Sequence, residues 1–135
     1  MKDDNFKDGM KYDIFFNIAS AKYGIPNGVL SRQCFKESSY NETAYNSNTG
    51  ASGLMQIIKK WHPECKDPFD PQQAIEYGAK YLSSNYIRFG CWKKALAAYN
   101  LGPNRLVGIL KEYGDDWLNH VPKETRDYVC FIIDD

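Results

Sequence analysis

The stretch "RQCFKESSYNETAYNSNTGASGLMQI", residues 32–57, joins the end of an amphipathic helix to a polar loop and a glycine-rich turn. A helix is predicted over residues 25–39, with Pro26 in its first turn. Residues spaced by three and four form one face of this helix, namely Val29, Leu30, Gln33, Cys34 and Glu37. Glu37 is therefore predicted to point inward, close to the C-terminal end of the helix. The loop that follows, residues 40–53, is dominated by Asn, Ser, Thr and Gly and carries no apolar period.

A buried carboxyl group at a helix C-terminus is suited to proton donation. Burial disfavours the ionised form, and so does the negative end of the helix dipole, so both effects raise the expected pKa of Glu37. A carboxylic acid that stays protonated near neutral pH can act as a general acid. Most glutamates at helix ends are simply solvated, so the periodicity alone leaves both interpretations of Glu37 open.

The sequence "GASGLMQI" after the loop has features of a ligand-binding turn. Gly50 and Gly53 permit tight backbone geometry and the close approach of a ligand. Gln56 offers one acceptor and two donors, and Met55 offers an adaptable apolar contact. The alternative is a turn that leads into a short helix over residues 54–61, with its apolar side chains in the core.

Two further motifs contain side chains that suit a cleft. Tyr99 and Asn100 stand at the end of a predicted helix in "AAYN", and Tyr128 lies in "ETRDYV" on the predicted last helix. In isolation, packed core tyrosines and an asparagine that caps a helix explain these residues equally well.

Apolar spacing and turn residues predict a mainly α chain with weak strand signals. Besides residues 25–39, helices are predicted over residues 10–22, 71–89, 91–100, 104–114 and from 122 onwards. Asp70 is a natural N-cap, with Pro71 in the first helical position and Gln73 able to close the cap. We expect one domain over residues 10–135, preceded by a flexible tail over residues 1–9.

The composition excludes several classes of function. The 135 residues carry a formal net charge of zero with dispersed Lys and Arg, so no nucleic-acid partner is expected. No apolar run approaches the roughly 18 residues of a membrane helix, so no membrane span is expected. The charged N-terminal residues lack the apolar core of a signal peptide, so none is expected.

Four cysteines occur at positions 34, 65, 91 and 130, without a CxxC pair. We therefore expect no zinc site, no other metal and no cofactor. The even number permits two disulfides in three pairings, but the lack of a signal peptide favours reduced, mostly buried thiols.

Four motifs in a fixed order carry a resemblance to a known family. They are "ES" at Glu37-Ser38, "SNTGASGLMQI" from Ser47 to Ile57, "AYNLG" from Ala98 to Gly102 and "ETRDYV" from Glu124 to Val129. The chain resembles lytic transglycosylases with the goose-type-lysozyme-like catalytic domain, which is found in soluble lytic murein transglycosylases and phage virion proteins. The similarity covers roughly residues 12–133. It implies a mainly α, lysozyme-like single domain with a small, β-poor loop lobe beside the catalytic helix.

The resemblance also implies roles for single residues. Glu37 would be the sole catalytic acid/base, with no metal required. The positions implied to support or contact the glycan are Ser38, Ser47, Met55, Gln56, Tyr99, Asn100 and Tyr128. Ser38 would support the helix end, while Tyr99 and Tyr128 would face Glu37. Some relatives carry a further acidic residue just before the last motif, where this chain has "NHVP", residues 119–122, so glycan contacts there stay open.

The implied reaction is cleavage of the β-1,4 bond between N-acetylmuramic acid (MurNAc) and N-acetylglucosamine (GlcNAc), with a 1,6-anhydro product. An inverting hydrolase needs a second carboxylate to activate water, and Glu42 is the only acid between Glu37 and Gly53. The alternatives are a goose-type-like hydrolase of peptidoglycan or chitin, and a glycan-binding virion module without turnover. We expect a monomer that acts on peptidoglycan glycan strands. The context favoured by the N-terminal sequence is a phage virion, or a phage-released lysis enzyme in the periplasm or cell wall, with a secretion- or conjugation-apparatus component as the alternative.

Overall fold

The computed structural model describes residues 10–133, so the predicted tail over residues 1–9 lies outside it. The described residues form two compact units, which divide between Lys80 and Tyr81, inside helix α4 (Pro71–Phe89). The described part is mainly helical, as predicted, with six α-helices, one 3-10 helix and one two-stranded sheet. The expectation of a single domain stays a prediction.

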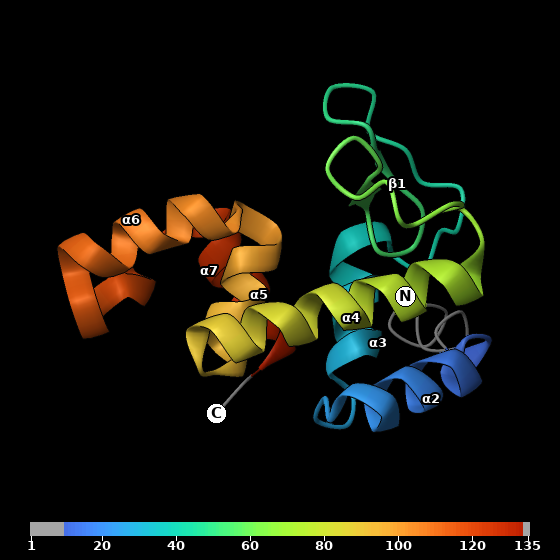
Figure 1. Cartoon of the computed structure of the whole chain (residues 1–135), viewed down its shortest axis with the longest axis horizontal. Helices are drawn as coiled ribbons and strands as arrows, with labels where there is room; N and C mark the ends of the chain where they lie inside the picture. Colours follow the sequence, from blue (N-terminus) through green and yellow to red (C-terminus); the bar gives the residue numbers. More distant parts are fainter. Residues whose placement is uncertain (1–9, 134–135) are drawn as a thin grey trace. The chain divides into compact units, whose positions relative to one another are not determined.

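In the first unit, two helices and the N-terminal half of α4 accompany a lobe of loops, which Figure 1 shows around β1. The elements besides α4 are α2 (Asp13–Tyr23), α3 (Val29–Ser38), β1 (Ala51–Ser52) and β2 (Ile57–Ile58). Helix α2 packs against α3. It ends at Tyr23, one residue beyond the predicted end, because Gly24 has a left-handed backbone (φ 67°).

The predicted inward face of α3 is confirmed. Its buried side chains are Val29, Leu30, Gln33 and Cys34. Glu37, at the C-terminal end of the same face, is half-buried. The predicted start at residue 25 is wrong, because the helix begins at Val29 and leaves Pro26 in the preceding turn. The cause is Gly28, whose φ of 85° is incompatible with a helix interior.

The predicted short helix over residues 54–61 is wrong. The backbone N–H of Gln56 donates to the carbonyl of Gly53 (3.2 Å), which closes a tight turn. Gln56 has a left-handed φ of 51°, so the chain reverses here where a helix would continue. Strand β2 then pairs antiparallel with β1, and Ile58 lies opposite Ala51.

The predicted start of α4 is confirmed. The Gln73 backbone N–H donates to Oδ2 of Asp70 (2.9 Å), and Pro71 is the first helical residue. The expected return contact from the Gln73 side chain is wrong, since its Oε1 accepts from the Asp67 backbone N–H (3.2 Å). The cap therefore depends on Asp70 and ties the preceding loop to the helix.

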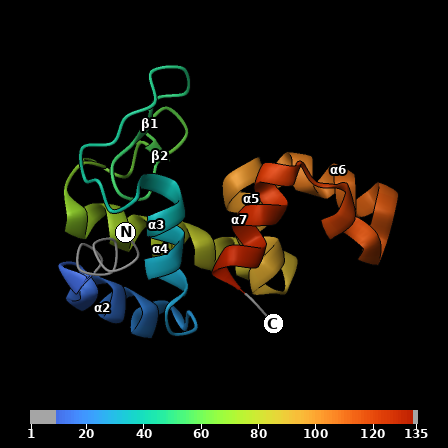
Figure 2. The same cartoon turned by 180° about the vertical axis from the view of Figure 1, so that it is seen from behind.

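The second unit is a small helical cluster in which α5 packs against α6 and α7 (Figure 2). After the end of α4 it contains α5 (Trp92–Leu101), α6 (Pro103–Tyr113), the 3-10 helix η1 (Gly114–His120) and α7 (Lys123–Ile132). Alanines on α5 are fully buried and let the neighbouring helices approach closely. Gly102 and Pro103 separate α5 from α6, between the two helices predicted over residues 91–100 and 104–114, whereas η1 was not predicted from the sequence.

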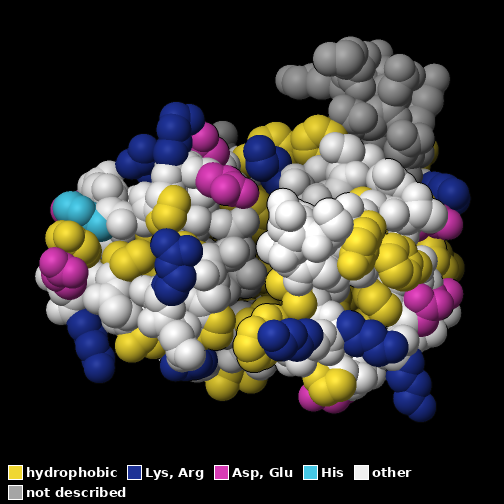
Figure 3. Space-filling view, turned by 90° about the horizontal axis from the view of Figure 1, so that it is seen from above, with side chains coloured by type: hydrophobic (Ala, Val, Ile, Leu, Met, Phe, Trp, Pro, Cys, Tyr) yellow, Lys and Arg dark blue, Asp and Glu magenta, His cyan; other side chains and the backbone are white. Residues whose placement is uncertain are grey.

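Charged side chains are dispersed on the face of the molecule seen in Figure 3. On the face seen in Figure 3, Lys and Arg stand among acidic, polar and apolar side chains without forming a continuous basic stripe. Among the helices of residues 10–133, none has both the length and the apolar character that crossing a membrane requires.

All four cysteines are free thiols in the structure. Cys34 and Cys65 are buried, Cys91 is half-buried and Cys130 is exposed. The expectation of mostly buried thiols therefore holds for only two of them.

Candidate active site

Glu37 lies in the last turn of α3, and its side chain is half-buried. The helix ends directly after it, because Ser39 adopts a left-handed φ of 53° and donates its N–H to the Phe35 carbonyl (2.8 Å). One turn earlier, burial of Cys34 and the nearby charge of Glu37 raise the pKa of the Cys34 thiol to about 12. The thiol therefore stays protonated near neutral pH and adds no charge beside Glu37.

Ser38 ties this helix end to the loop lobe. Its Oγ donates to the carbonyl oxygen of Leu54 at 2.8 Å and also lies 3.2 Å from the carbonyl of Cys34. The glycine-rich turn is thereby held against the helix end that carries Glu37. The resemblance implies that Ser38 supports this helix end, and that role in activity stays a prediction.

The turn itself requires glycine at position 53. A Cβ atom on Gly53 would lie 1.8 Å from the carbonyl oxygen of Pro68, and the backbone has a φ of 76°. The Gly53 N–H donates to the carbonyl of Ala44 (2.8 Å). The tight geometry expected of "GASG" is therefore present, and it is the protein's own backbone that approaches Gly53 closely.

Met55 and Gln56, both expected beside the glycan, hold the lobe together. The Gln56 Nε2 donates to the carbonyl of Gly53 (3.1 Å) and lies 3.5 Å from that of Ala44. Met55 has no exposed surface and packs against Gly78 of α4, where an added Cβ would lie 3.1 Å away. The structure gives the Met55 side chain a packing position in the core, and its expected contact with the glycan stays a prediction.

Ser47 lies in an exposed turn of the same lobe. The side-chain oxygen of Asn46 accepts from the backbone N–H groups of Asn48 (2.9 Å) and Thr49 (3.3 Å), which orders the turn. The Ser47 side chain is therefore accessible to a ligand.

The second unit brings the two C-terminal motifs together. Thr125 Oγ1 on α7 donates to Oδ1 of Asn100 on α5 at 2.8 Å. Tyr128 is buried on α7, and the half-buried ring of Tyr99 lies 5.3 Å from that of Tyr81. Thr125 is the residue that sequence reasoning missed, although its place in the quoted motif "ETRDYV" was an available signal.

The predicted site residues thus form two groups, each assembled within its own unit. The first unit holds Glu37, Ser38, Ser47, Met55 and Gln56, and the second unit holds Tyr99, Asn100 and Tyr128. The expected approach of the second group to Glu37 stays a prediction.

Glu42, the one acid that could have served as a second catalytic carboxylate, already has partners. Its Oε2 accepts a hydrogen bond from the Tyr12 hydroxyl at 2.5 Å and lies 3.7 Å from Nζ of Lys11. Both partners precede α2, so this acid links the lobe to the N-terminal helix.

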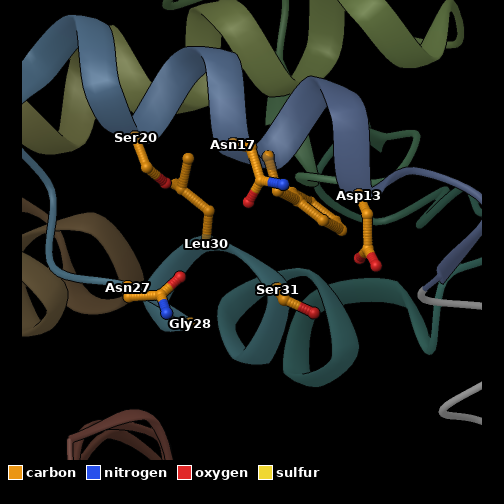
Figure 4. A pocket seen from close by; sticks show the side chains of 8 residues that line it. Asp13, Asn17, Ser20, Asn27, Gly28, Leu30 and Ser31 are labelled. Carbon is orange, nitrogen blue, oxygen red and sulfur yellow. The ribbon is translucent and has the colours of Figure 1, made fainter.

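Two further observations concern the described chain outside the predicted site. Within residues 10–133, no group of three or more His, Cys, Asp or Glu side chains is arranged to hold a metal ion. A pocket with a volume of about 180 cubic ångströms lies between α2 and α3, where Figure 4 shows Asp13, Asn17 and Ser31. None of its lining residues belongs to the predicted site.

Most of the chain matches a known protein family. The family described as the Transglycosylase SLT domain matches residues 14–116 of the chain. This span is most of the chain, and it includes Glu37, the glycine-rich turn and the pair Tyr99-Asn100. The chain belongs to the transglycosylase SLT domain family.

Relatives of this SLT domain occur in bacteria and in a phage. The membrane-bound lytic murein transglycosylase F 2 of Alkalilimnicola ehrlichii is 27% identical over 93% of this chain, which spans 30% of that protein. A transglycosylase of Enterobacteria phage PRD1 is 35% identical over 64% of this chain, which spans 33% of it.

A solved structure extends the likeness to the fold. An inactive Glu-to-Gln mutant of the lytic transglycosylase Slt from Pseudomonas aeruginosa matches 91% of this chain with a TM-score of 0.81 and 26% identity. The chain spans 23% of that protein. The predicted mainly α, lysozyme-like fold is thereby confirmed.

Proposed function

We propose that the chain is a peptidoglycan lytic transglycosylase that cleaves the β-1,4 bond between MurNAc and GlcNAc and leaves 1,6-anhydroMurNAc. The hydrogen bond from Ser38 to the Leu54 carbonyl carries the proposal, because it joins the helix end that carries the half-buried Glu37 to the glycine-rich turn. Both segments lie inside the residues that match the SLT domain family. The names of the relatives support the reaction class. The inactive Glu-to-Gln mutant of Slt supports a glutamate as the decisive group.

In the proposed reaction, Glu37 serves first as acid and then as base. Its carboxyl proton passes to the glycosidic oxygen, and the bond from that oxygen to C1 of MurNAc breaks. Positive charge develops on C1, and the N-acetyl group of the same sugar can stabilise it as an internal nucleophile. The Glu37 carboxylate then takes the proton of the C6 hydroxyl, and O6 bonds to C1. No water is consumed, and Glu37 regains its proton.

The intramolecular nucleophile fits the arrangement of acids in the first unit. A hydroxyl on the substrate itself needs no protein group to position a water molecule. Glu42, which a hydrolase would use for that purpose, is engaged by Tyr12 and Lys11. The neighbouring contacts therefore favour the transglycosylase over the hydrolase.

The remaining residues have supporting roles in this proposal. Ser38, Met55 and Gln56 keep the turn in place against the end of α3. Ser47 contacts the glycan from its exposed turn. Tyr99, Asn100 and Tyr128 contribute from the second unit, where the hydrogen bond between Thr125 and Asn100 joins their helices.

The proposed partner is the glycan strand of peptidoglycan, and the proposed working form is a monomer. The phage relative named transglycosylase supports a phage context, in which the protein acts on the cell wall from the virion or as a released lysis enzyme. Sedimentation of the protein alone and with soluble muropeptides measures the oligomeric state.

A digest of purified peptidoglycan, read by mass spectrometry of the released muropeptides, tests the function. Products one water lighter than hydrolytic ones are expected from the wild type and not from Glu37→Gln. Loss of a single proton donor should lower the rate by at least about a hundredfold. Products with ordinary reducing ends would instead assign the chain to the hydrolases, and no release from either protein would leave a binding module.

A further inference from the structure

Gln33 is an unusual residue for the core of the first unit. It lies on α3, its side chain has no exposed surface, and neither Nε2 nor Oε1 has a hydrogen-bond partner. A buried amide without partners destabilises a fold, whereas an apolar side chain of similar size at the same place does not. Because nearly all buried polar groups in proteins are paired, this exception calls for a physical reason.

The spacing of Gln33 and Glu37 supplies that reason. Residues four apart on a helix are neighbours on its surface, and a glutamine can hydrogen-bond an acid at this distance. Helical side chains lean toward the N-terminus, so the Glu37 side chain leans back over the turn that carries Gln33. After burial, the charge of Glu37 is a further cause of the raised pKa of Cys34, the residue that follows Gln33.

We propose that Gln33 is a positioning residue whose side-chain N–H donates to one carboxyl oxygen of Glu37 during turnover, which leaves the other oxygen directed at the glycosidic bond. The inference rests on the function proposed above. Nε2 keeps both its protons throughout, so the hydrogen bond can form when Glu37 is protonated and strengthens when the carboxylate appears. The amide thus stabilises the base that must next accept the C6 hydroxyl proton.

The chain contains a matched control for this idea. Asn85 on α4 is the other described residue with a buried, unpartnered side-chain nitrogen. Its helix neighbours at three and four residues are Leu82, Arg88, Tyr81 and Phe89, none of which is an acid. A buried amide without a catalytic neighbour is therefore available in the same protein.

The first test compares Gln33→Met, which keeps the length of the side chain but removes the amide, with Asn85→Leu. For Gln33→Met we expect kcat to fall about tenfold, KM to stay within about twofold and the melting temperature to stay equal or rise. The alkaline limb of the activity profile should move up by about one pH unit, because the ionised Glu37 loses a donor. Asn85→Leu should change only stability. Wild-type kcat and pH profile in a folded Gln33→Met protein would overturn the proposal.

A second measurement needs neither turnover nor a core substitution in the protein under study. In a 15N-glutamine-labelled wild type, the Gln33 side-chain amide resonance should shift with pH at the midpoint measured for the Glu37 carboxyl carbon. Burial raises the pKa values of Cys34 and Tyr40, so neither titrates in the same range. The Glu37→Gln variant should abolish the shift, which separates Glu37 from other acids such as Asp13 on α2. An amide resonance that does not move with the Glu37 carboxyl would reject the inference even if the transglycosylase reaction is confirmed.

Discussion

At the scale of single residues, Glu37 lies on a face whose other members are buried, and it lies at the one position of that face where the helix ends. The periodic spacing in the sequence predicts its direction, and the polar loop after it predicts the helix end. The hydrogen bond that makes the position specific, from Ser38 to the Leu54 carbonyl, joins residues 16 apart and has no local signal. The candidate acid could therefore be predicted from the sequence, but its anchoring to the turn could not.

The substitution Glu42→Gln tests whether the chain is a transglycosylase or a hydrolase that uses Glu42 as its catalytic base. A catalytic base that activates water contributes about a hundredfold or more to the rate, so its loss would be obvious. Because Glu42 is held by Tyr12 and Lys11, we expect the variant to keep kcat within about threefold. Loss of the charged acceptor should cost about 1 kcal/mol of stability. Steady-state rates and urea unfolding measure the two effects, and a hundredfold lower rate in the folded variant would restore the hydrolase.

Thiol reactivity tests the environment of the Glu37 helix end. Cys34 is buried beside Glu37 with a pKa of about 12, and Cys65 is buried with a raised pKa, so neither supplies an accessible thiolate. Cys130 is exposed and Cys91 is half-buried. At pH 8 a small disulfide reagent should label Cys130 first and leave Cys34 unmodified until urea is added, as followed by peptide mass spectrometry. Rapid labelling of Cys34 in the native protein would contradict the burial of this face.

At the scale of elements, the long helices were predictable and the lobe was not. Helix α4 starts at the predicted cap because Asp70 and Pro71 act locally, within one turn. The segment over residues 54–61 has the apolar spacing of a helix, but its course depends on contacts from elsewhere. The carbonyl of Pro68 lies close to Gly53. Gln56 adopts a left-handed backbone, which cannot be predicted from its residue type.

Gly53→Ala should therefore disrupt the lobe far more than Gly50→Ala. Both glycines have positive φ, but a Cβ on Gly50 meets no atom within 4 Å, whereas one on Gly53 meets the Pro68 carbonyl at 1.8 Å. Gly50→Ala should cost about 1–2 kcal/mol from backbone strain, and Gly53→Ala more than about 3 kcal/mol because backbone must move. Activity should fall in Gly53→Ala only, because the displaced turn no longer brings the Leu54 carbonyl to the Ser38 hydroxyl. Equal unfolding midpoints and rates for the two variants would show that the close approach is unimportant.

At the scale of the whole molecule, the motifs predicted from the sequence are distributed over two compact units that share α4. The order of the motifs along the chain could be predicted from the sequence, because each motif is a short run of residues. The pairing of motifs inside a unit was not, because it rests on contacts such as Thr125 with Asn100, which lie 25 residues apart. Stability of each unit thus depends on polar links between distant segments as well as on its apolar core.

The contacts of His62 and Glu64 with Tyr77 on α4 are one such link, and we expect them to make the stability of the chain depend on pH. His62 is half-buried, and its Nδ1 lies 2.8 Å from the Tyr77 hydroxyl, which donates to Glu64 (2.9 Å). The single hydroxyl proton is used toward Glu64, so Nδ1 of a neutral His62 is the donor to Tyr77. Burial lowers the pKa of His62 below its usual value near 6.5.

The sign of the effect follows from linkage. Between the lowered folded pKa and the value in the unfolded chain, the unfolded chain binds more protons, so stability is present above about pH 6.5 and is lost as the pH falls. Urea midpoints of the wild type should therefore decrease from pH 7 to pH 5, and His62→Gln, which cannot titrate, should flatten this slope. His120→Gln is the comparison for a histidine outside this link, since the Nε2 atom of His120 lies 2.9 Å from Oδ2 of Asp116. The carboxyl groups with lowered pKa values, among them Glu64, lose their contribution to stability only at more acidic pH. They therefore do not account for a change in stability between pH 7 and pH 5. An unchanged slope in His62→Gln would show that the link between the loop and α4 is not sensitive to protonation.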